Sequence, residues 1–234
     1  MFVMLLMSGC AVKQKEPISK SDFLLNTFVT VTLYDTDKEE ILDGAMDVCR
    51  EYEDVLSTTI ETSEIYQMNH RKEGERQFTV SDKTAEVLKK GLEYCEMSHG
   101  AFDITIEPLS SLWDFTGENP KVPDADLIQK ELAKVGYEKV SLDGNIVTFA
   151  DDDTAIDLGA IAKGFIADRI KDYLTEQGVK SAIINLGGNV LCIGEKTDGT
   201  PFKIGLQKPF ADRSETVAAL DINDLSVVSS GVYE

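Results

Sequence analysis

The chain has 234 residues, with 42 Asp and Glu against 23 Lys and Arg, which gives a formal net charge of −19. Such an acidic protein repels the phosphates of nucleic acids, so its charge argues against a DNA or RNA partner. The length and the 42% hydrophobic content are ordinary for a globular protein of one large or two small domains. An anionic ligand would need local help from a metal, a lysine or a helix N-terminus.

An apolar run at the start of the chain ends in Ser8-Gly9-Cys10. It is similar to the end of a bacterial lipoprotein signal, although the run is short and lacks a basic start. An incidental cysteine is the alternative. We expect residues 1–21 to be a signal remnant and a polar tether, with a lipid on Cys10 that holds the protein on the membrane. This places it in the bacterial cell envelope, on the extracytoplasmic side.

The other cysteines fit no zinc or redox spacing. Cys49 and Cys95 lie among apolar residues in helical patterns, which predicts buried thiols. The only histidines, His70 and His99, are far apart in the sequence, and we assign neither of them a metal or acid–base role.

Apolar spacing and turn residues predict the secondary structure in chain order. The expected helices cover residues 37–56, 81–100, 124–135 and 156–177, and the expected strands cover residues 28–34, 140–149 (a hairpin), 182–193 (two strands), 202–206, 216–222 and 226–229. Residues 57–74 are polar and irregular. Helices and strands mix without strict alternation, which predicts an α+β fold with antiparallel sheets.

Three segments could carry chemistry. Residues 157–164 have two glycines at a predicted helix start, each about 1 kcal/mol less favourable than alanine there, which suggests that a ligand approaches the backbone closely. A carbonyl in the first turn can serve a hard cation, and Lys163 can reach a phosphate. The alternative is that Asp157 only caps the helix and Lys163 is a solvated surface residue.

The other two segments also have ordinary structural interpretations. Residues 100–113 join a glycine, an acid and the only tryptophan, and can be a helix end that leads into a core strand. Residues 185–189 can be a two-residue hairpin turn.

Taken together, the motifs resemble one known family. GAFDIT at 100–105 with Pro108 and Trp113, DLGAIAKGF at 157–165, NLGGN at 185–189 and SSGVYE at 229–234 occur in the order typical of the FAD:protein FMN transferase (ApbE) family. SEIYQMN at 63–69 is similar to an earlier motif of that family. The resemblance runs from about Phe23 to the last residue, so residues 22–234 are identified as an ApbE-like domain.

The resemblance implies a T-fold-like α+β architecture and an enzyme. With magnesium, the family transfers FMN from FAD to a Ser or Thr hydroxyl of a target flavoprotein and releases AMP. By position, the implied FAD contacts are Leu25, Ala101, Phe102, Asp103, Asp157 and Lys163, and the backbone carbonyl of Ala160 is the implied metal ligand.

The sequence departs from the family pattern at two positions and at its end. Asn26 replaces a glycine, and Thr59 replaces a frequent aromatic residue. The family's later histidine and its acid-plus-threonine metal site have no counterpart in these 234 residues, so we expect the C-terminal part of the domain to be missing. We therefore assign no general base, and expect weak FAD binding and no transfer by this chain alone.

Other functions remain open at this point. One is an envelope lipoprotein that binds FAD without transferring FMN, and another is an FAD pyrophosphatase that releases FMN and AMP. A solute-binding lipoprotein unrelated to flavins is a third.

Overall fold

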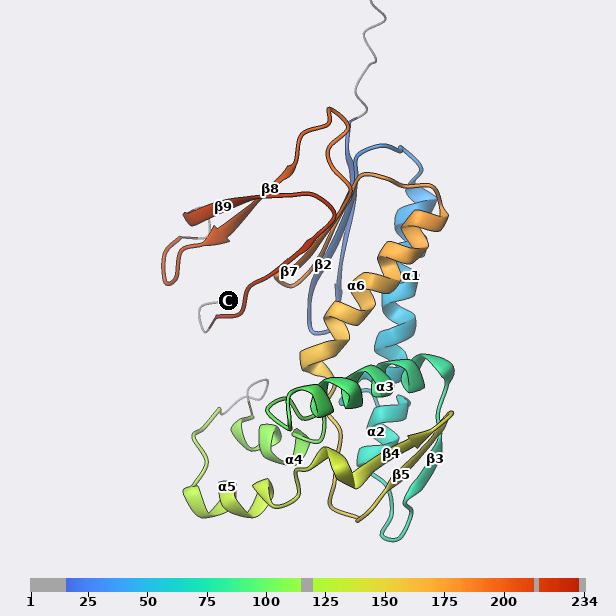
Figure 1. Cartoon of the computed structure of the whole chain (residues 1–234), viewed down its shortest axis with the longest axis vertical. Coiled ribbons are helices and arrows are strands. Elements are labelled where there is room, and N and C mark those ends of the chain that lie inside the picture. The colour runs from blue at the N-terminus through green and yellow to red at the C-terminus, as the bar shows by residue number, and fades with distance from the viewer. Residues whose placement is uncertain (1–15, 115–119, 213–214, 232–234) are drawn as a thin grey trace, which may run out of the picture.

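The computed structural model describes residues 16–114, 120–212 and 215–231. Figure 1 shows two stacked parts: a large sheet with two long helices above, and a smaller group of helices and short strands below. Helices and antiparallel sheets occur together, so the predicted α+β class is confirmed. Among the described residues, no helix combines the length and the apolar content that crossing a bilayer requires.

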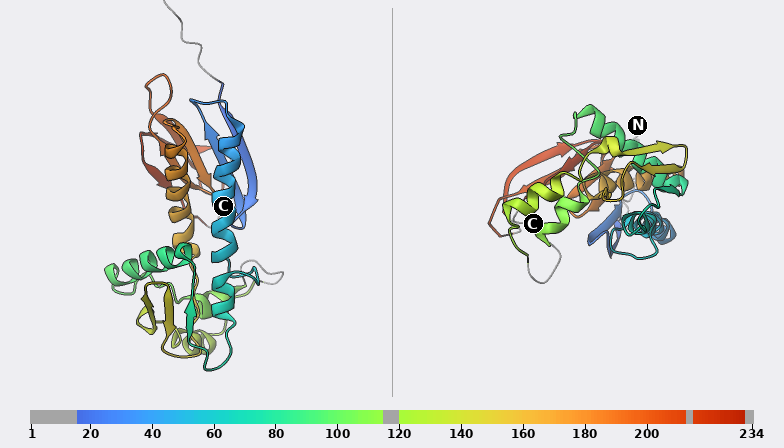
Figure 2. Two further views of the ribbon diagram at one scale, coloured as in Figure 1. Left: turned by 90° about the vertical axis from the view of Figure 1, so that its right-hand side faces the viewer. Right: turned by 90° about the horizontal axis from the view of Figure 1, so that it is seen from below.

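The large sheet has the strand order β1-β2-β6-β7-β10, and each neighbouring pair is antiparallel. Its strands are β1 (Ile18–Leu24), β2 (Thr27–Leu33), β6 (Ala182–Leu186), β7 (Asn189–Ile193) and β10 (Ser226–Val228). Two helices, α1 (Glu39–Leu56) and α6 (Gly159–Glu176), cover one face of the sheet, as Figures 1 and 2 show.

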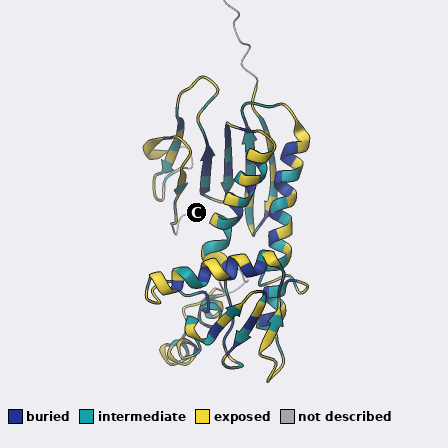
Figure 3. Cartoon of the chain, turned by 45° about the vertical axis from the view of Figure 1, so that its right-hand side comes forward, coloured by how far each residue is buried: buried dark blue, intermediate teal, exposed yellow. Residues whose placement is uncertain are grey.

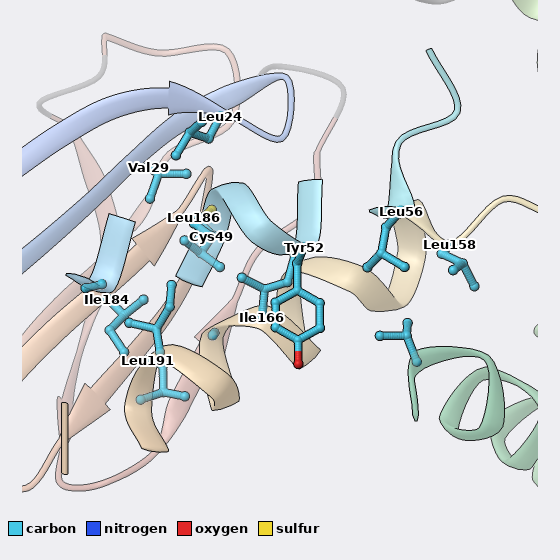
Figure 4. Close-up of a cluster of buried hydrophobic side chains, with 14 of the residues drawn as sticks. Leu24, Val29, Cys49, Tyr52, Leu56, Leu158, Ile166, Ile184, Leu186 and Leu191 are labelled. Carbon is cyan, nitrogen blue, oxygen red and sulfur yellow. The ribbon is translucent and has the colours of Figure 1, made fainter. Parts of the chain in front are cut away.

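The main core lies between this sheet and the two helices. Val29, Val31 and Leu33 alternate along β2 and are fully buried, as the two-residue period of a strand requires. Figure 4 shows Leu186 and Ile184 of the sheet facing side chains of α1 and α6. Burial of this apolar surface is the main force that holds the helices on the sheet.

The lower part is built on a three-stranded sheet of order β3-β5-β4. Its elements are α2 (Glu64–Asn69), β3 (Gln77–Thr79), α3 (Asp82–Met97), α4 (Glu107–Ser110), the 3-10 turn η1 (Ser111–Trp113), α5 (Ala125–Leu132), the 3-10 turn η2 (Tyr137–Lys139), β4 (Val140–Asp143) and β5 (Ile146–Phe149). Helix α3 contacts α1 and α6 and so joins the two parts.

A two-stranded sheet, β8 (Phe202–Gln207) and β9 (Thr216–Ile222), packs on the other face of the large sheet. Phe202 and Ile222 bury themselves against Cys192 of β7. All residues of β9 except Ile222 are exposed. Only the end of the hairpin near Phe202 and Ile222 therefore packs on the large sheet, and Figure 3 shows the rest projecting away from it.

Several sequence predictions need correction. The tether does not extend to Ser21, because Ile18 already begins β1; its polar residues suit an edge strand that β2 pairs along its whole length. Residues 57–74 contain α2, whose six residues are too short for a periodic signal, and β3 was not predicted. Residues 100–106 form no strand.

Other predictions are confirmed. The helix predicted over residues 81–100 is α3, and Ser81 caps it, with its hydroxyl oxygen accepting from the N–H of Thr84. Cys49, Cys95 and Cys192 are buried free thiols. Burial raises the pKa of Cys49 to about 12, so this thiol is inert at neutral pH. Helix α6 begins at Gly159, three residues after the predicted start.

Two tight hairpin turns pack against each other. Leu25 and Asn26 join β1 to β2 with φ of 55° at both residues, and Gly187 and Gly188 join β6 to β7 with φ of 59° and 86°. Left-handed φ at both central residues gives the turn that matches the twist of the strands. A Cβ on Gly187 would lie 2.2 Å from Oγ1 of Thr27, so this position needs glycine for both its backbone and its contact.

We therefore expect Gly187→Ala to destabilise the protein more than Gly144→Ala. Gly144 also has a left-handed φ of 56°, but no atom lies within 4 Å of the position of its Cβ. The control should lose about 1–2 kcal/mol from backbone strain alone. The clash should add about 1–3 kcal/mol at Gly187. Urea unfolding measures both, and equal losses would contradict the close contact.

Candidate functional site

A pocket of about 1100 Å³ opens where the two parts of the molecule meet. Its walls come from the C-terminal half of α3, the N-terminal half of α6, the turn between β6 and β7, and the segment that includes β10. Its volume is at the upper end of the range typical of pockets for small molecules. All three sequence segments that could carry chemistry contribute to it or lie directly behind it.

The start of α6 is held by the carboxylate of Asp157. One oxygen, Oδ1, accepts from the N–H of Gly159 at 2.8 Å, and Oδ2 accepts from Oγ of Ser110 at 3.3 Å. The N–H of Asp157 donates to the carbonyl of Ile104 at 2.8 Å. Asp157 thus satisfies a donor at the helix start and ties this start to the segment that follows α3.

Asn69 fixes the segment that enters α6. Its side-chain amide donates from Nδ2 to the carbonyl of Ile156 at 2.8 Å, and its Oδ1 accepts from the N–H of Ile156 at 2.7 Å. Ile156 is fully buried, so these two backbone groups have no access to water. The side-chain amide of Asn69 therefore makes the two backbone hydrogen bonds that a neighbouring strand would otherwise make with Ile156.

The end of α3 turns the chain back toward the pocket. His99 and Gly100 have left-handed φ of 54° and 79°, and the N–H of Gly100 donates to the carbonyl of Cys95, which closes the helix. Oγ of Ser98 then accepts from the N–H of Phe102 at 2.9 Å. As a result, the Phe102 ring lies against Tyr94 of α3, with a centroid separation of 6.3 Å.

Asp103 holds this loop from behind. Its Oδ1 accepts from the N–H and the hydroxyl of Thr105, and its Oδ2 accepts from the N–H of Tyr137 at 2.9 Å. Thr105 is fully buried and in turn accepts from the N–H of Gly136. The structure therefore shows Asp103 in a positioning role.

Several polar side chains in the pocket wall, Lys163, Asp168 and Asn189 among them, make no ion pair or side-chain hydrogen bond with a described residue. Lys163 makes no ion pair with a described residue, whereas Lys90 and Arg169, also in the wall, pair with Glu93 and Asp172. The side chain of Asn189 is only 8% exposed and makes no hydrogen bond with a described residue. Because no described residue engages the ammonium of Lys163 or the amide of Asn189, both groups are free to bind a polar or anionic ligand in the pocket.

A half-buried acid lies near Asp157. Burial raises the pKa of the Glu107 carboxyl, the negative charge of Asp157 raises it further, and His70 opposes the shift. The chain thus keeps two carboxyl groups close together behind the start of α6, although they are 50 residues apart in sequence. The sequence offered no signal for this pair.

The structure places the predicted site residues in two groups. Phe102, Ala160 and Lys163 line the pocket together. The other four, Leu25, Ala101, Asp103 and Asp157, do not line it, and their contacts with FAD stay predictions. Asn189 was missed as a site residue although it ends the NLGGN motif, because its burial and its lack of a partner arise only in the fold.

The described residues do not assemble a magnesium site. No three side chains of His, Cys, Asp or Glu within residues 16–114, 120–212 and 215–231 lie close enough together to hold a metal ion. Magnesium takes about six oxygen ligands with near-octahedral geometry, and the carbonyl of Ala160 would supply one of them.

The fold and the pocket define a two-part α+β protein with a ligand site at its centre. Residues 25–234 match the model of the ApbE family, and the chain belongs to this family. The resemblance seen in the sequence is therefore confirmed.

Curated relatives of the chain are named FAD:protein FMN transferase. The chain is 38% identical over 218 residues to an FAD:protein FMN transferase of Klebsiella pneumoniae strain 342, with 92% of this chain and 66% of the relative covered. It is 28% identical to one from Vibrio cholerae O395, with 98% and 70% covered. The chain thus spans about two thirds of the length of these relatives.

Solved structures show the same fold. The flavin transferase ApbE of Vibrio cholerae superposes with a TM-score of 0.83 at 27% identity, covering 93% of this chain and 72% of that one. The ApbE protein of Thermotoga maritima superposes with a TM-score of 0.84 at 28% identity, with 94% and 72% covered.

We expect Asn69→Ala to lower the free energy of unfolding by about 2–3 kcal/mol, because it leaves two buried backbone groups of Ile156 without partners. Asn145→Ala is the matched control: this half-buried amide donates to only one backbone group, the carbonyl of Val80, and otherwise to the exposed carboxylate of Asp82. The control should lose about 1 kcal/mol or less. Chemical denaturation compares the two, and equal losses would show that Asn69 does not hold the entry to α6.

Proposed function

We propose that this protein transfers the FMN half of FAD to a Ser or Thr hydroxyl of a target flavoprotein and releases AMP. Membership in the ApbE family supports the proposal, as do relatives named for this activity. The pocket supports it in physical terms, because Lys163, which makes no ion pair with a described residue, and the amide of Asn189 both line a cavity of about 1100 Å³.

The chemistry needs positive charge at the diphosphate. The acceptor oxygen forms a bond to the FMN phosphorus, the bond from this phosphorus to the bridging oxygen breaks, and AMP leaves with the bridging oxygen. The hydroxyl proton passes to a base, which we leave unassigned. Negative charge grows on the phosphoryl oxygens during this step, and Lys163 can stabilise it. In a chain of net charge −19, an unpaired lysine matters especially.

A divalent cation, magnesium by our proposal, would supply further stabilisation of the phosphoryl oxygens when bound. The carbonyl of Ala160 at the start of α6 is the ligand we propose for it. The described residues alone do not fit a complete site, so the lysine and the pocket walls are the parts whose roles follow from this chain.

The test is incubation of the full-length protein with FAD, magnesium and an acceptor domain, followed by in-gel flavin fluorescence. A fluorescent acceptor supports the transferase. Free FMN and AMP without a labelled acceptor would replace the proposal with a pyrophosphatase, and bound FAD without either product would replace it with a flavin-binding protein.

In the same preparation, Lys163→Ala should weaken FAD binding or slow transfer roughly ten- to a hundredfold, since it removes a charged hydrogen-bond donor. Lys163→Arg should restore part of the loss. The control is Lys203→Ala, which removes the same charge from β8 outside the pocket, where Lys203 pairs with Asp221. Asp157→Asn should keep the hydrogen bond from the N–H of Gly159, and with it thermal stability, while reducing FAD binding. Unchanged FAD affinity in both site variants, measured by fluorescence quenching, would leave these residues with structural roles only.

We also propose that a lipid on Cys10 holds the protein on the extracytoplasmic side of the bacterial membrane. The apolar run before Ser8-Gly9-Cys10 supports this, and Cys10 lies outside the described residues. Expressed in a bacterial host, the protein should partition into detergent and carry a lipid mass, and Cys10→Ala should abolish both. Identical soluble fractions for the two proteins would contradict the anchor.

A further inference from the structure

The wall of the pocket that comes from the C-terminal end of α3 is rich in large apolar side chains. Tyr94 and Met97 of α3 are 47% and 72% exposed, and both line the pocket with Phe102. Single exposed apolar residues are common on protein surfaces. Here two exposed apolar side chains and the half-buried Phe102 line one wall of a pocket, and such apolar patches mark ligand sites. We call Tyr94, Met97 and Phe102 the α3 shelf.

The shelf is exposed because α3 uses its other face for the core. Val87, Leu88 and Cys95 point into the core and are fully buried, which directs Tyr94 and Met97 outward. The left-handed helix end and the bond from the N–H of Phe102 to Ser98 then return Phe102 to the same side. The backbone hydrogen bonds at the end of α3 therefore fix the position of the shelf residues.

Polar groups and the shelf share the same pocket. Lys163 and the amide of Asn189 belong to its wall, as do Ser229 and Ser230. A ligand that fills both parts needs a charged or polar centre and a flat apolar end. A dinucleotide has this division, with a diphosphate between two planar ring systems.

We propose that the α3 shelf binds a planar ring of the flavin dinucleotide while Lys163 faces the diphosphate. The inference rests on the proposed function, since that function supplies FAD as the ligand. Tyr94 can meet a ring by its face or edge, and the thioether of Met97 can pack on the same ring. In this role the two residues determine where the ring lies.

The test is FAD affinity of Tyr94→Ala and Met97→Ala by flavin fluorescence quenching and calorimetry. Each variant should weaken FAD binding about three- to tenfold, and Tyr94→Phe should bind nearly as well as the original protein. Thermal stability should change little, because Met97 is largely exposed and Tyr94 is about half exposed. Phe210→Ala is the control, since Phe210 is an aromatic residue that is 81% exposed and outside the pocket.

Competition by riboflavin and by AMP, each of which contains one of the two ring systems of FAD, identifies the ring that the shelf binds. If riboflavin competes less well against FAD in Tyr94→Ala, the shelf binds the isoalloxazine; if AMP competes less well, it binds the adenine. Either result supports the proposal. If FAD binding falls in Lys163→Ala and stays unchanged in Tyr94→Ala and Met97→Ala, the shelf is overturned and the proposed function stands. If the original protein binds no FAD, both are overturned.

Discussion

The entry into α6 is the constraint on which the rest of the site depends. Residues 154–158 approach this helix outside any strand or helix, so their backbone groups need other partners. Asn69 supplies two of them with a single amide, and Asp157 satisfies the first helical donor. Because a helix is stiff, a fixed first turn also fixes where Lys163 lies one turn later.

The pocket then follows from packing between parts that are distant in sequence. Helix α6 must cover the large sheet with one face, and its N-terminus must reach α3 below. The order β2-β6-β7 puts the Gly187–Gly188 turn beside the β1–β2 turn, at the end of the sheet where the pocket opens. No single segment forms the cavity.

The electrostatics of the site contrast with those of the whole chain. The net charge of −19 disfavours any anion at long range. Most described cations near the pocket are already paired with carboxylates, so their charge is largely neutralised. Lys163 keeps its charge available at close range, where desolvation strengthens it. The charge of Lys163 in the pocket thus opposes the negative charge of the whole chain. An anionic ligand is therefore favoured only if its shape brings it close to Lys163.

The sequence by itself determined what depends on neighbours along the chain. Apolar periodicity placed α1, α3 and most strands, and Ser81 and the Gly-Gly turn marked boundaries through their own backbone preferences. The family motifs identified 100–105, 157–165 and 185–189 as parts of one site, and Lys163, Ala160 and Phe102 do line the pocket.

Only the tertiary structure decided which motif residues face the ligand site and which support it. Asp103 and Asp157 stand in motifs beside Phe102 and Lys163, yet Tyr137 donates its N–H to Asp103 and Ser110 donates its hydroxyl to Asp157. β1 and α2 were missed for a related reason, since an edge strand and a six-residue helix gain most of their stability from packing. The exposed shelf and the unpartnered amide of Asn189 also depend on how segments meet, because burial is a property of the assembled chain and not of its local order.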